Sequence, residues 1–156
     1  MTPAIVQLNK LAVPYQLHQY THDASCKSFG LEAVAKLNVA TERVFKTLVV
    51  DVDNDYLAVA IIPVAKSLSL KKLAKALKAK KVKMADANKV QNSTGYVLGG
   101  VSPLGQKKAL ATLLDSSAKT LDTLFISGGK RGLEIELAPN ALNMALKANF
   151  ADITSE

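Results

Sequence analysis

Hydrophobic and polar residues alternate along two neighbouring stretches in the middle of the chain, residues 44–52 and 56–62. Alternation with a period of two is typical of a β-strand. The residues between the two stretches are Asp53-Asn54-Asp55, and Asn and Asp are favoured in tight turns. The sequence therefore predicts a β-hairpin here.

Other stretches carry helix or strand signals. Thr2 followed by Pro3 is typical of a helix start, and Ser28 precedes a run with helical spacing of Leu31, Val34 and Ala35. Helices are predicted at about 3–11, 28–38, 69–78, 86–93 and 139–147, and strands at 15–20, near Val82, and at 109–114, 123–127 and 133–137. Hairpins mixed with helices predict one α/β domain over residues 1–156, with a mixed, strongly curved or barrel-like sheet and helices packed outside.

Lys46 interrupts the hydrophobic face of the first strand. Alternation places it on the same face as Leu48, Val50 and Val52, which should point into the core. An unpaired buried ammonium group is costly, so the lysine either extends to water at the strand end or meets a bound anionic or carbonyl group. Sequence alone leaves both interpretations open.

A glycine-rich segment follows about fifty residues later. Residues 93–105 contain four of the eight glycines of the chain. Glycines let a ligand approach backbone N–H groups, although a tight connection between two elements would need them as well. The segment lacks the patterns of a dinucleotide-binding or phosphate-binding loop. The N–H groups around Gly99, Gly100, Val101 and Ser102 are candidates for stabilising an oxyanion.

Composition narrows the class of protein. The chain has 156 residues, of which 49% are hydrophobic, enough for one substantial core. No apolar run is long enough to span a bilayer, and Met1-Thr2-Pro3 does not resemble a secretory signal. The single Cys26 cannot form an internal disulfide. We therefore expect a cytoplasmic protein with no membrane association.

Positive charge is concentrated in one part of the chain. The formal net charge is +7, and residues 66–89 contain nine lysines and one acidic residue, Asp86. Helical spacing places Lys71, Lys75 and Lys78 on one face, opposite an apolar stripe. Such a face can simply be solvated, but lysines without acidic neighbours also suit a polyanion. We favour RNA, because no recognition-helix or zinc-finger pattern for DNA is visible.

Few residues could serve as a nucleophile or a metal ligand. His18, His22 and Cys26 do not have the spacing of a zinc site, and we expect neither a metal nor a cofactor. A cysteine nucleophile at Cys26 remains an alternative, although a lone cysteine in a polar loop is more often incidental. No Gly-x-Ser-x-Gly motif is present. An enzyme of this kind would act by orientation and electrostatic stabilisation.

Three motifs carry a resemblance to a known family. They are Phe45-Lys46-Thr47-Leu48, the segment Gly95-Tyr96-Val97-Leu98-Gly99-Gly100-Val101-Ser102-Pro103-Leu104-Gly105 with its Gly-x-x-x-Pro element, and Ser127-Gly128-Gly129-Lys130-Arg131-Gly132. In this order they resemble the YbaK branch of the aminoacyl-tRNA editing superfamily, and the likeness runs from Thr2 to Ile153. The resemblance implies hydrolysis of cysteine from Cys-tRNA(Pro), also Cys-tRNA(Cys), in trans beside prolyl-tRNA synthetase. The substrate's own thiol would attack its ester.

The resemblance also implies roles for particular residues. Lys46 matches the essential lysine that binds the tRNA 3′ end or the aminoacyl group, and the segment from Gly99 to Pro103 matches the loop that holds the carbonyl. Pocket positions correspond to Tyr20, Phe29, Thr47, Ser127 and Glu134, and at Glu134 close relatives often carry Asp. Each has a structural alternative: Tyr20 and Phe29 as core aromatics, Thr47 as a strand surface residue, Ser127 as a turn residue, and Glu134 as an ion-pair partner of Lys130 or Arg131.

Two other functions would also fit the sequence. One is a non-catalytic protein that binds RNA or aminoacyl groups. The other is a hydrolase of small amino-acid esters, whose activity would not depend on Lys71, Lys75 and Lys78 or on moderate salt, whereas a tRNA enzyme should weaken as salt rises.

Overall fold

The computed structural model of the chain describes residues 1–155. The helices are α1 (Pro3–Lys10), α2 (Phe29–Leu37), α3 (Leu70–Leu77), α4 (Ala87–Thr94) and α5 (Pro139–Leu146), with 3-10 turns η1 (Thr41–Arg43) and η2 (Ser116–Thr120). The strands are β1 (Gln16–Gln19), β2 (Phe45–Val52), β3 (Tyr56–Pro63), β4 (Ser67–Leu68), β5 (Val82–Met84), β6 (Ala111–Asp115), β7 (Leu124–Ser127), β8 (Leu133–Leu137), β9 (Asn149–Ala151) and β10 (Thr154–Ser155). The predicted helices and strands are confirmed; β4, β9 and β10 were not predicted.

The strands form a mixed arrangement of separate ladders. The largest sheet has the order β5-β2-β3-β6-β9, a second has the order β1-β8-β7, and β4 pairs with β10. Strands β2 and β3 pair antiparallel, whereas β3 and β6 pair parallel, so the prediction of a mixed α/β fold is confirmed. The barrel-like detail is not confirmed. Closure requires both edge strands to be hydrogen-bonded, but within residues 1–155 only one bridge, Val44 to Phe125, links the two larger sheets.

Strand β2 is buried on both faces. Val50 and Val52 pack with Leu73 of α3 in one cluster, while Phe45 and Val49 belong to the main cluster, which contains residues of α1, β7 and β8. The prediction of a single core-facing side for this strand is therefore incomplete. Because the first residues of β2 lie where the two sheets meet, Lys46 and Thr47 are placed beside the second sheet.

Local signals explain where most helices begin and end. The hydroxyl of Thr2 accepts from the Ile5 amide at 3.5 Å, that of Ser69 from the Lys72 amide at 3.1 Å, and the Asp86 carboxylate from the Lys89 amide at 2.9 Å. Each such cap contributes about 1 kcal/mol. Helix α2 differs, because the Ser28 side chain forms no capping hydrogen bond within the described residues.

Leu31, one of the apolar residues with helical spacing in α2, does not pack in the core. It is 48% exposed, and the buried residues of the helix are Glu32 and Ala33. The helix packs through a face that includes a carboxylate, because Glu32 has hydrogen-bond partners in the loop that precedes the helix. Leu31 is left at an opening in the surface.

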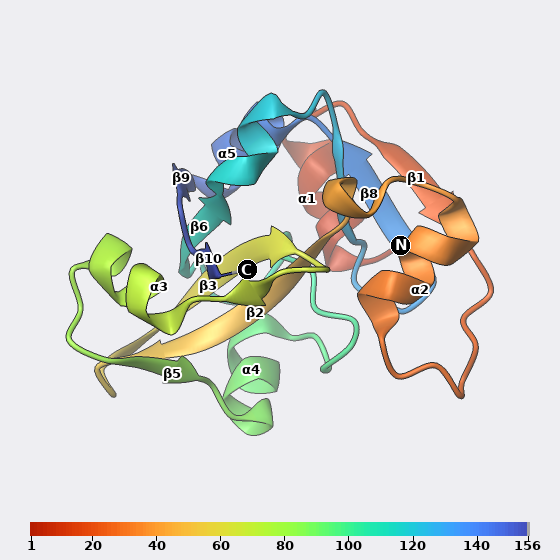
Figure 1. Cartoon of the computed structure of the whole chain (residues 1–156). Helices are drawn as coiled ribbons and strands as arrows, with labels where there is room; N and C mark the ends of the chain where they lie inside the picture. The colour runs from red at the N-terminus through yellow and green to blue at the C-terminus, as the bar shows by residue number, and fades with distance from the viewer. Residues whose placement is uncertain (156) are drawn as a thin grey trace.

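Figure 1 shows how the elements are distributed. Helix α3 and strand β5 lie at one end of the molecule, at the left of the view, while α1, α2, β1 and β8 lie at the other end. The β2–β3 hairpin runs between them. No helix within residues 1–155 has the length and apolar character required to cross a membrane.

Candidate active site

A cavity of about 280 Å³ lies between the start of β2, the amino end of α2, the glycine-rich loop and the end of β7. Eight of the predicted site residues line it: Tyr20, Phe29, Lys46, Thr47, Gly99, Val101, Ser127 and Glu134. They come from six separate parts of the chain. The fold therefore brings Lys46 and the glycine-rich loop to one concave site.

Three other predicted residues are placed behind this surface. Gly100 is buried and its N–H donates to the Val97 carbonyl at 3.0 Å. Ser102 is fully buried and accepts from the Leu104 amide at 3.3 Å, and Pro103 borders a different groove. None of the three lines the cavity. The hydrogen bonds of Gly100 and Ser102 stay within the loop and hold its shape. The amides of Gly99 and Val101, in contrast, donate to no protein acceptor among the described residues.

Both the backbone conformation and the close neighbours of position 99 require a glycine there. Its φ of +89° lies in the region that favours glycine, and a Cβ atom there would lie 2.6 Å from the Phe29 ring and 2.8 Å from the Arg131 side chain. The loop backbone therefore approaches both side chains closely. These contacts hold Gly99 at the cavity wall.

Lys46 is partly buried at the second position of β2, where it pairs with Ile62 on β3. It forms no ion pair within residues 1–155. A lysine without a carboxylate partner beside a cavity is available to an anionic or carbonyl group of a ligand.

Buried polar groups without partners line the same cavity. Glu134 on β8 is 7% exposed, and burial raises the pKa of its carboxyl to about 8. It is not paired with Lys130 or Arg131, so the ion-pair alternative is not observed among the described residues. The Thr47 hydroxyl is also buried and has no hydrogen-bond partner there. Burial, followed by the charges of Glu134 and Glu32, raises the pKa of Tyr20 to about 12.

The cavity rim contains residues that the sequence did not single out. The Arg131 guanidinium lies 4.0 Å from the centre of the Phe29 ring, and its Nη2 donates to the Leu98 carbonyl at 3.5 Å. In β7, β8 and the turn between them, only Ser127 and Glu134 had been expected at the site. The adjacent cations in Gly-Gly-Lys-Arg-Gly were the available signal, because a turn between two strands presents its side chains outward.

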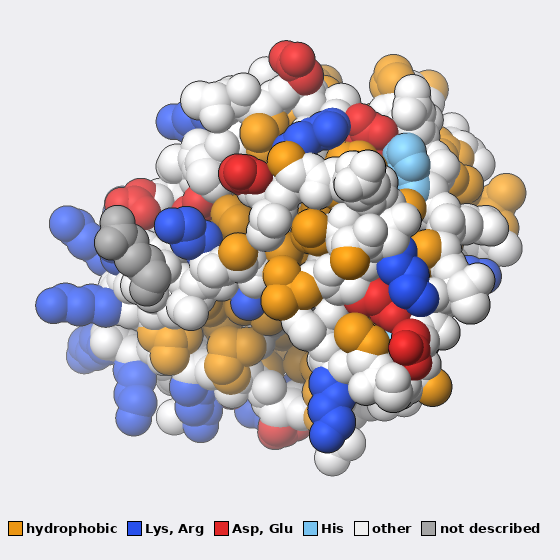
Figure 2. Space-filling view, turned by 45° about the vertical axis from the view of Figure 1, so that its right-hand side comes forward, with side chains coloured by type: hydrophobic (Ala, Val, Ile, Leu, Met, Phe, Trp, Pro, Cys, Tyr) orange, Lys and Arg blue, Asp and Glu red, His pale blue; other side chains and the backbone are white. Residues whose placement is uncertain are grey.

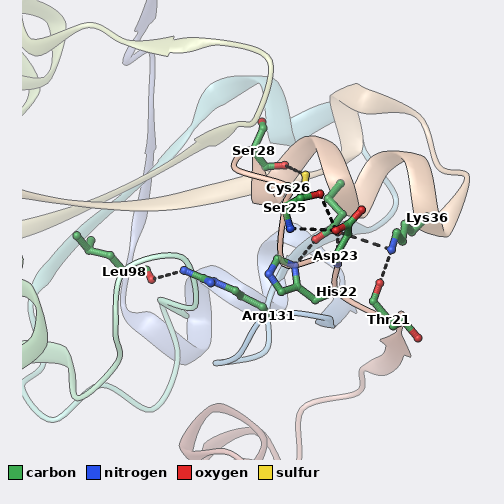
Figure 3. Close-up of polar contacts among 10 residues, drawn as sticks. Thr21, His22, Asp23, Ser25, Cys26, Ser28, Lys36, Leu98 and Arg131 are labelled. Carbon is green, nitrogen blue, oxygen red and sulfur yellow. Dashed lines mark hydrogen bonds and ion pairs between the residues drawn. The ribbon is translucent and has the colours of Figure 1, made fainter.

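A polar network holds the segment that carries Phe29. Glu32 accepts from the Asp23 amide at 2.8 Å and lies 2.6 Å from His22 Nδ1. These hydrogen bonds lower the pKa of the Glu32 carboxyl, with the Asp23 amide as the largest cause. The His22 ring packs against Phe29, with 5.6 Å between the ring centres. Figure 3 shows this segment beside Arg131, which extends toward Leu98.

The side chains around the cavity do not include a protein thiol or imidazole among the described residues. Cys26 Sγ donates to the Ser28 carbonyl at 3.6 Å outside the lining. His18 and His22 are each bonded to a glutamate instead, Glu136 and Glu32. Within residues 1–155, no three His, Cys, Asp or Glu side chains are grouped so that they could hold a metal ion.

The basic surface lies away from the cavity. Lys71 and Lys75 on α3 and Lys78 at its C-cap are exposed and form no ion pair within the described chain. Two neighbours do pair: Lys72 with Asp152 at 3.1 Å and Lys89 with Asp51 at 2.8 Å. In Figure 2, lysine and arginine side chains gather at the left and lower edge, on the side of α3 and β5.

The fold and the cavity define an α/β protein with a small concave site bordered by a glycine-rich loop, a lysine and a buried carboxyl. A sequence profile of the aminoacyl-tRNA editing domain matches residues 24–144. The chain is 38% identical over 156 residues to EbsC of Enterococcus faecalis, a candidate Cys-tRNA(Pro)/Cys-tRNA(Cys) deacylase, and the alignment covers 99% of this chain and 94% of EbsC. The chain therefore belongs to the aminoacyl-tRNA editing domain family, as the sequence motifs had indicated.

Solved structures share the fold. The crystal structure of the hypothetical protein APE2540 matches with a TM-score of 0.88 and 24% identity, over 99% of this chain and all of the other. A candidate trans-editing enzyme for prolyl tRNA synthetase matches with a TM-score of 0.84 and 19% identity, over 100% of this chain and 99% of the other. At these identities the likeness establishes the fold and leaves the substrate open.

Proposed function

We propose that this protein is a trans-acting aminoacyl-tRNA deacylase that hydrolyses the ester of Cys-tRNA(Pro), and of Cys-tRNA(Cys) as a second substrate. The observation that carries the proposal is the composition of the cavity wall. Hydrogen-bond donors and three cationic side chains surround a small cavity, but its described lining offers no thiol or imidazole that would attack an ester. Such a site suits a substrate that brings its own nucleophile.

Cysteine is the amino acid whose ester best meets this requirement. Its thiol sulfur bonds to the carbonyl carbon, the ester C–O bond breaks, and the thiol proton is transferred to the ribose oxygen; water then opens the cyclic thioester. The amides of Gly99 and Val101, which have no protein acceptor among the described residues, would stabilise the developing oxyanion. Lys46 would bind the tRNA 3′ end or the aminoacyl group.

The remaining lining residues would select and orient the substrate. Tyr20, Phe29, Thr47 and Ser127 border the cavity around Glu134, whose carboxyl is neutral at pH 7 and can donate a hydrogen bond. Gly100, Ser102 and Pro103 would act indirectly, by fixing the loop that presents the amides. A cavity of about 280 Å³ favours a small aminoacyl group over a large one.

The tRNA would also contact the protein outside the cavity. Lys71, Lys75 and Lys78 supply an exposed cationic face for phosphates, which carries no sequence information. The choice of tRNA would then come from association with prolyl-tRNA synthetase.

A panel of aminoacyl-tRNAs tests the proposal directly. We expect fast deacylation of Cys-tRNA(Pro), with Ala-tRNA(Pro) hydrolysed far more slowly because alanine has no thiol. Lys46→Ala should abolish the activity, whereas Cys26→Ser should leave it largely intact because Cys26 lies outside the cavity. Loss of activity in Cys26→Ser would instead identify a protein thiol nucleophile. Binding of tRNA without any ester hydrolysis would favour a non-catalytic protein.

A further inference from the structure

The mouth of the cavity has an excess of positive charge. Lys46, Lys130 and Arg131 line it, and none of them forms an ion pair within residues 1–155. Glu134 is the acidic residue of the described lining, and burial keeps its carboxyl neutral at pH 7 by raising its pKa to about 8. A concave site with several cations and no negative charge favours an anionic ligand.

The amino end of α2 adds to this field. Residues 28–31 border the cavity, and the Ser28 side chain makes no capping hydrogen bond. The first N–H groups of this nine-residue helix therefore remain unpaired among the described residues. A second observation points to a ligand in the same cavity: Glu134 is more than nine-tenths buried, lines the cavity and has no hydrogen-bond partner in the described chain.

Arg131 is held in position but has unused donors. Its guanidinium stacks on Phe29 at 4.0 Å, and one Nη2 contact to Leu98, at 3.5 Å, is long for a hydrogen bond. A guanidinium has five N–H donors in a planar fork, so most of them remain free. The stacking against Phe29 restricts the side chain before any ligand arrives, which reduces the entropy lost on binding. In Figure 3 the guanidinium lies between Leu98 and the loop that contains His22.

We propose that Arg131, Lys130 and the amino end of α2 form a phosphate site for the 5′-phosphate group of the terminal nucleotide of an aminoacylated RNA. The aminoacyl group would extend from this nucleotide into the cavity, toward Lys46 and Glu134. The proposal rests on the proposed function, because it assigns the part of the same substrate that lies nearest the ester.

Two pairs of small molecules isolate the contribution of one phosphate. The first pair is adenosine and 5′-AMP, compared by calorimetry or NMR titration. The second pair is the 2′(3′)-cysteinyl esters of the same two compounds, compared by kcat/KM for hydrolysis. A charge-assisted phosphate contact should favour the phosphorylated member by about tenfold in each pair. Arg131→Gln should remove this preference, Arg131→Lys should keep part of it, and Lys130→Gln should reduce it less.

Lys10→Gln is the matched control, since Lys10 is exposed on α1 and lies outside the cavity lining. It should retain the full preference for phosphate. If Arg131→Gln slows the two esters equally, Arg131 only shapes the cavity and the phosphate site is refuted. Equal binding of AMP and adenosine by the unmodified protein would refute it too, even when both esters are hydrolysed. If the esters and Cys-tRNA(Pro) are not hydrolysed but AMP is preferred, the proposed function fails and the phosphate site stands.

Discussion

Replacing Glu134 with glutamine should stabilise the protein, and the gain should grow with pH. Glu134 is 7% exposed on β8 and has no hydrogen-bond or ion-pair partner within residues 1–155. Transfer of a carboxylate from water to such a position is unfavourable, so burial raises its pKa from the ordinary 4.5 to about 8. Glutamine has nearly the same shape and never ionises.

The size of the effect follows from the two pKa values. Below pH 4.5 the group is neutral in both the folded and unfolded chains and contributes no difference. Between 4.5 and about 8 the unfolded chain is ionised while the folded chain remains protonated, so stability falls by about 1.4 kcal/mol per pH unit as the pH rises. The total approaches about 5 kcal/mol above pH 8. This is an upper bound, because water that enters the open cavity stabilises the charge.

Urea unfolding at pH 5, 6, 7 and 8, followed by circular dichroism, measures the difference between the two proteins. We expect Glu134→Gln to gain stability over the unmodified protein in each step, up to about 3 kcal/mol at pH 7. Glu42→Gln, the same chemical change at an exposed glutamate, is the control and should show no comparable trend. A difference for Glu134→Gln that does not change with pH would refute the reasoning, since it would mean that the carboxyl is ionised in the folded protein.

Three further changes test the site, the basic face and the core. Gly99→Ala should lower kcat/KM for deacylation by about tenfold or more, which corresponds to a rise of about 1.4 kcal/mol in the activation free energy. The added Cβ would lie 2.6 Å from the Phe29 ring, and the φ of +89° disfavours a residue with a side chain. Unchanged kcat/KM would show that the loop can move away. Replacing Lys71, Lys75 and Lys78 with glutamine should weaken tRNA binding and flatten its salt dependence without slowing hydrolysis of a small cysteine ester, and an unaltered salt slope in filter binding would exclude this face. Leu73→Ala should lower the free energy of unfolding by about 2–5 kcal/mol, because Leu73 is the fully buried residue through which α3 packs on β2 and β3. A loss below about 1 kcal/mol in urea unfolding would indicate that the cluster collapses around the gap.

The glycine-rich loop shows how far local sequence can specify a site. Its glycines predicted an unusual backbone that brings amides to a ligand, and Gly99 and Val101 do line the cavity, with N–H groups that have no protein acceptor among the described residues. The direction of each amide could not be predicted. Gly100, the immediate neighbour, turns its N–H to the Val97 carbonyl because the loop makes a tight turn there. Adjacent glycines thus have different surroundings, which the sequence does not distinguish.

Arg131 illustrates the opposite case. Its contact with Phe29 joins residues about one hundred positions apart, and it forms only after the turn between β7 and β8 is placed against the start of α2. Neither residue carries a local pattern that predicts the other. The stacked pair, and the rim that it forms above Gly99, therefore became visible only in the folded chain.

The sequence by itself determined the helices, the hairpin and the turns, because caps, periodicity and turn residues act over a few neighbouring positions. Its motifs also placed the chain in its family. The tertiary structure alone decided that the sheets stay separate, that β2 is buried on both faces, and that Glu134 loses its water among side chains from distant elements. Burial and electrostatic environment arise when surfaces far apart in the chain are packed together, so no local stretch of residues encodes them.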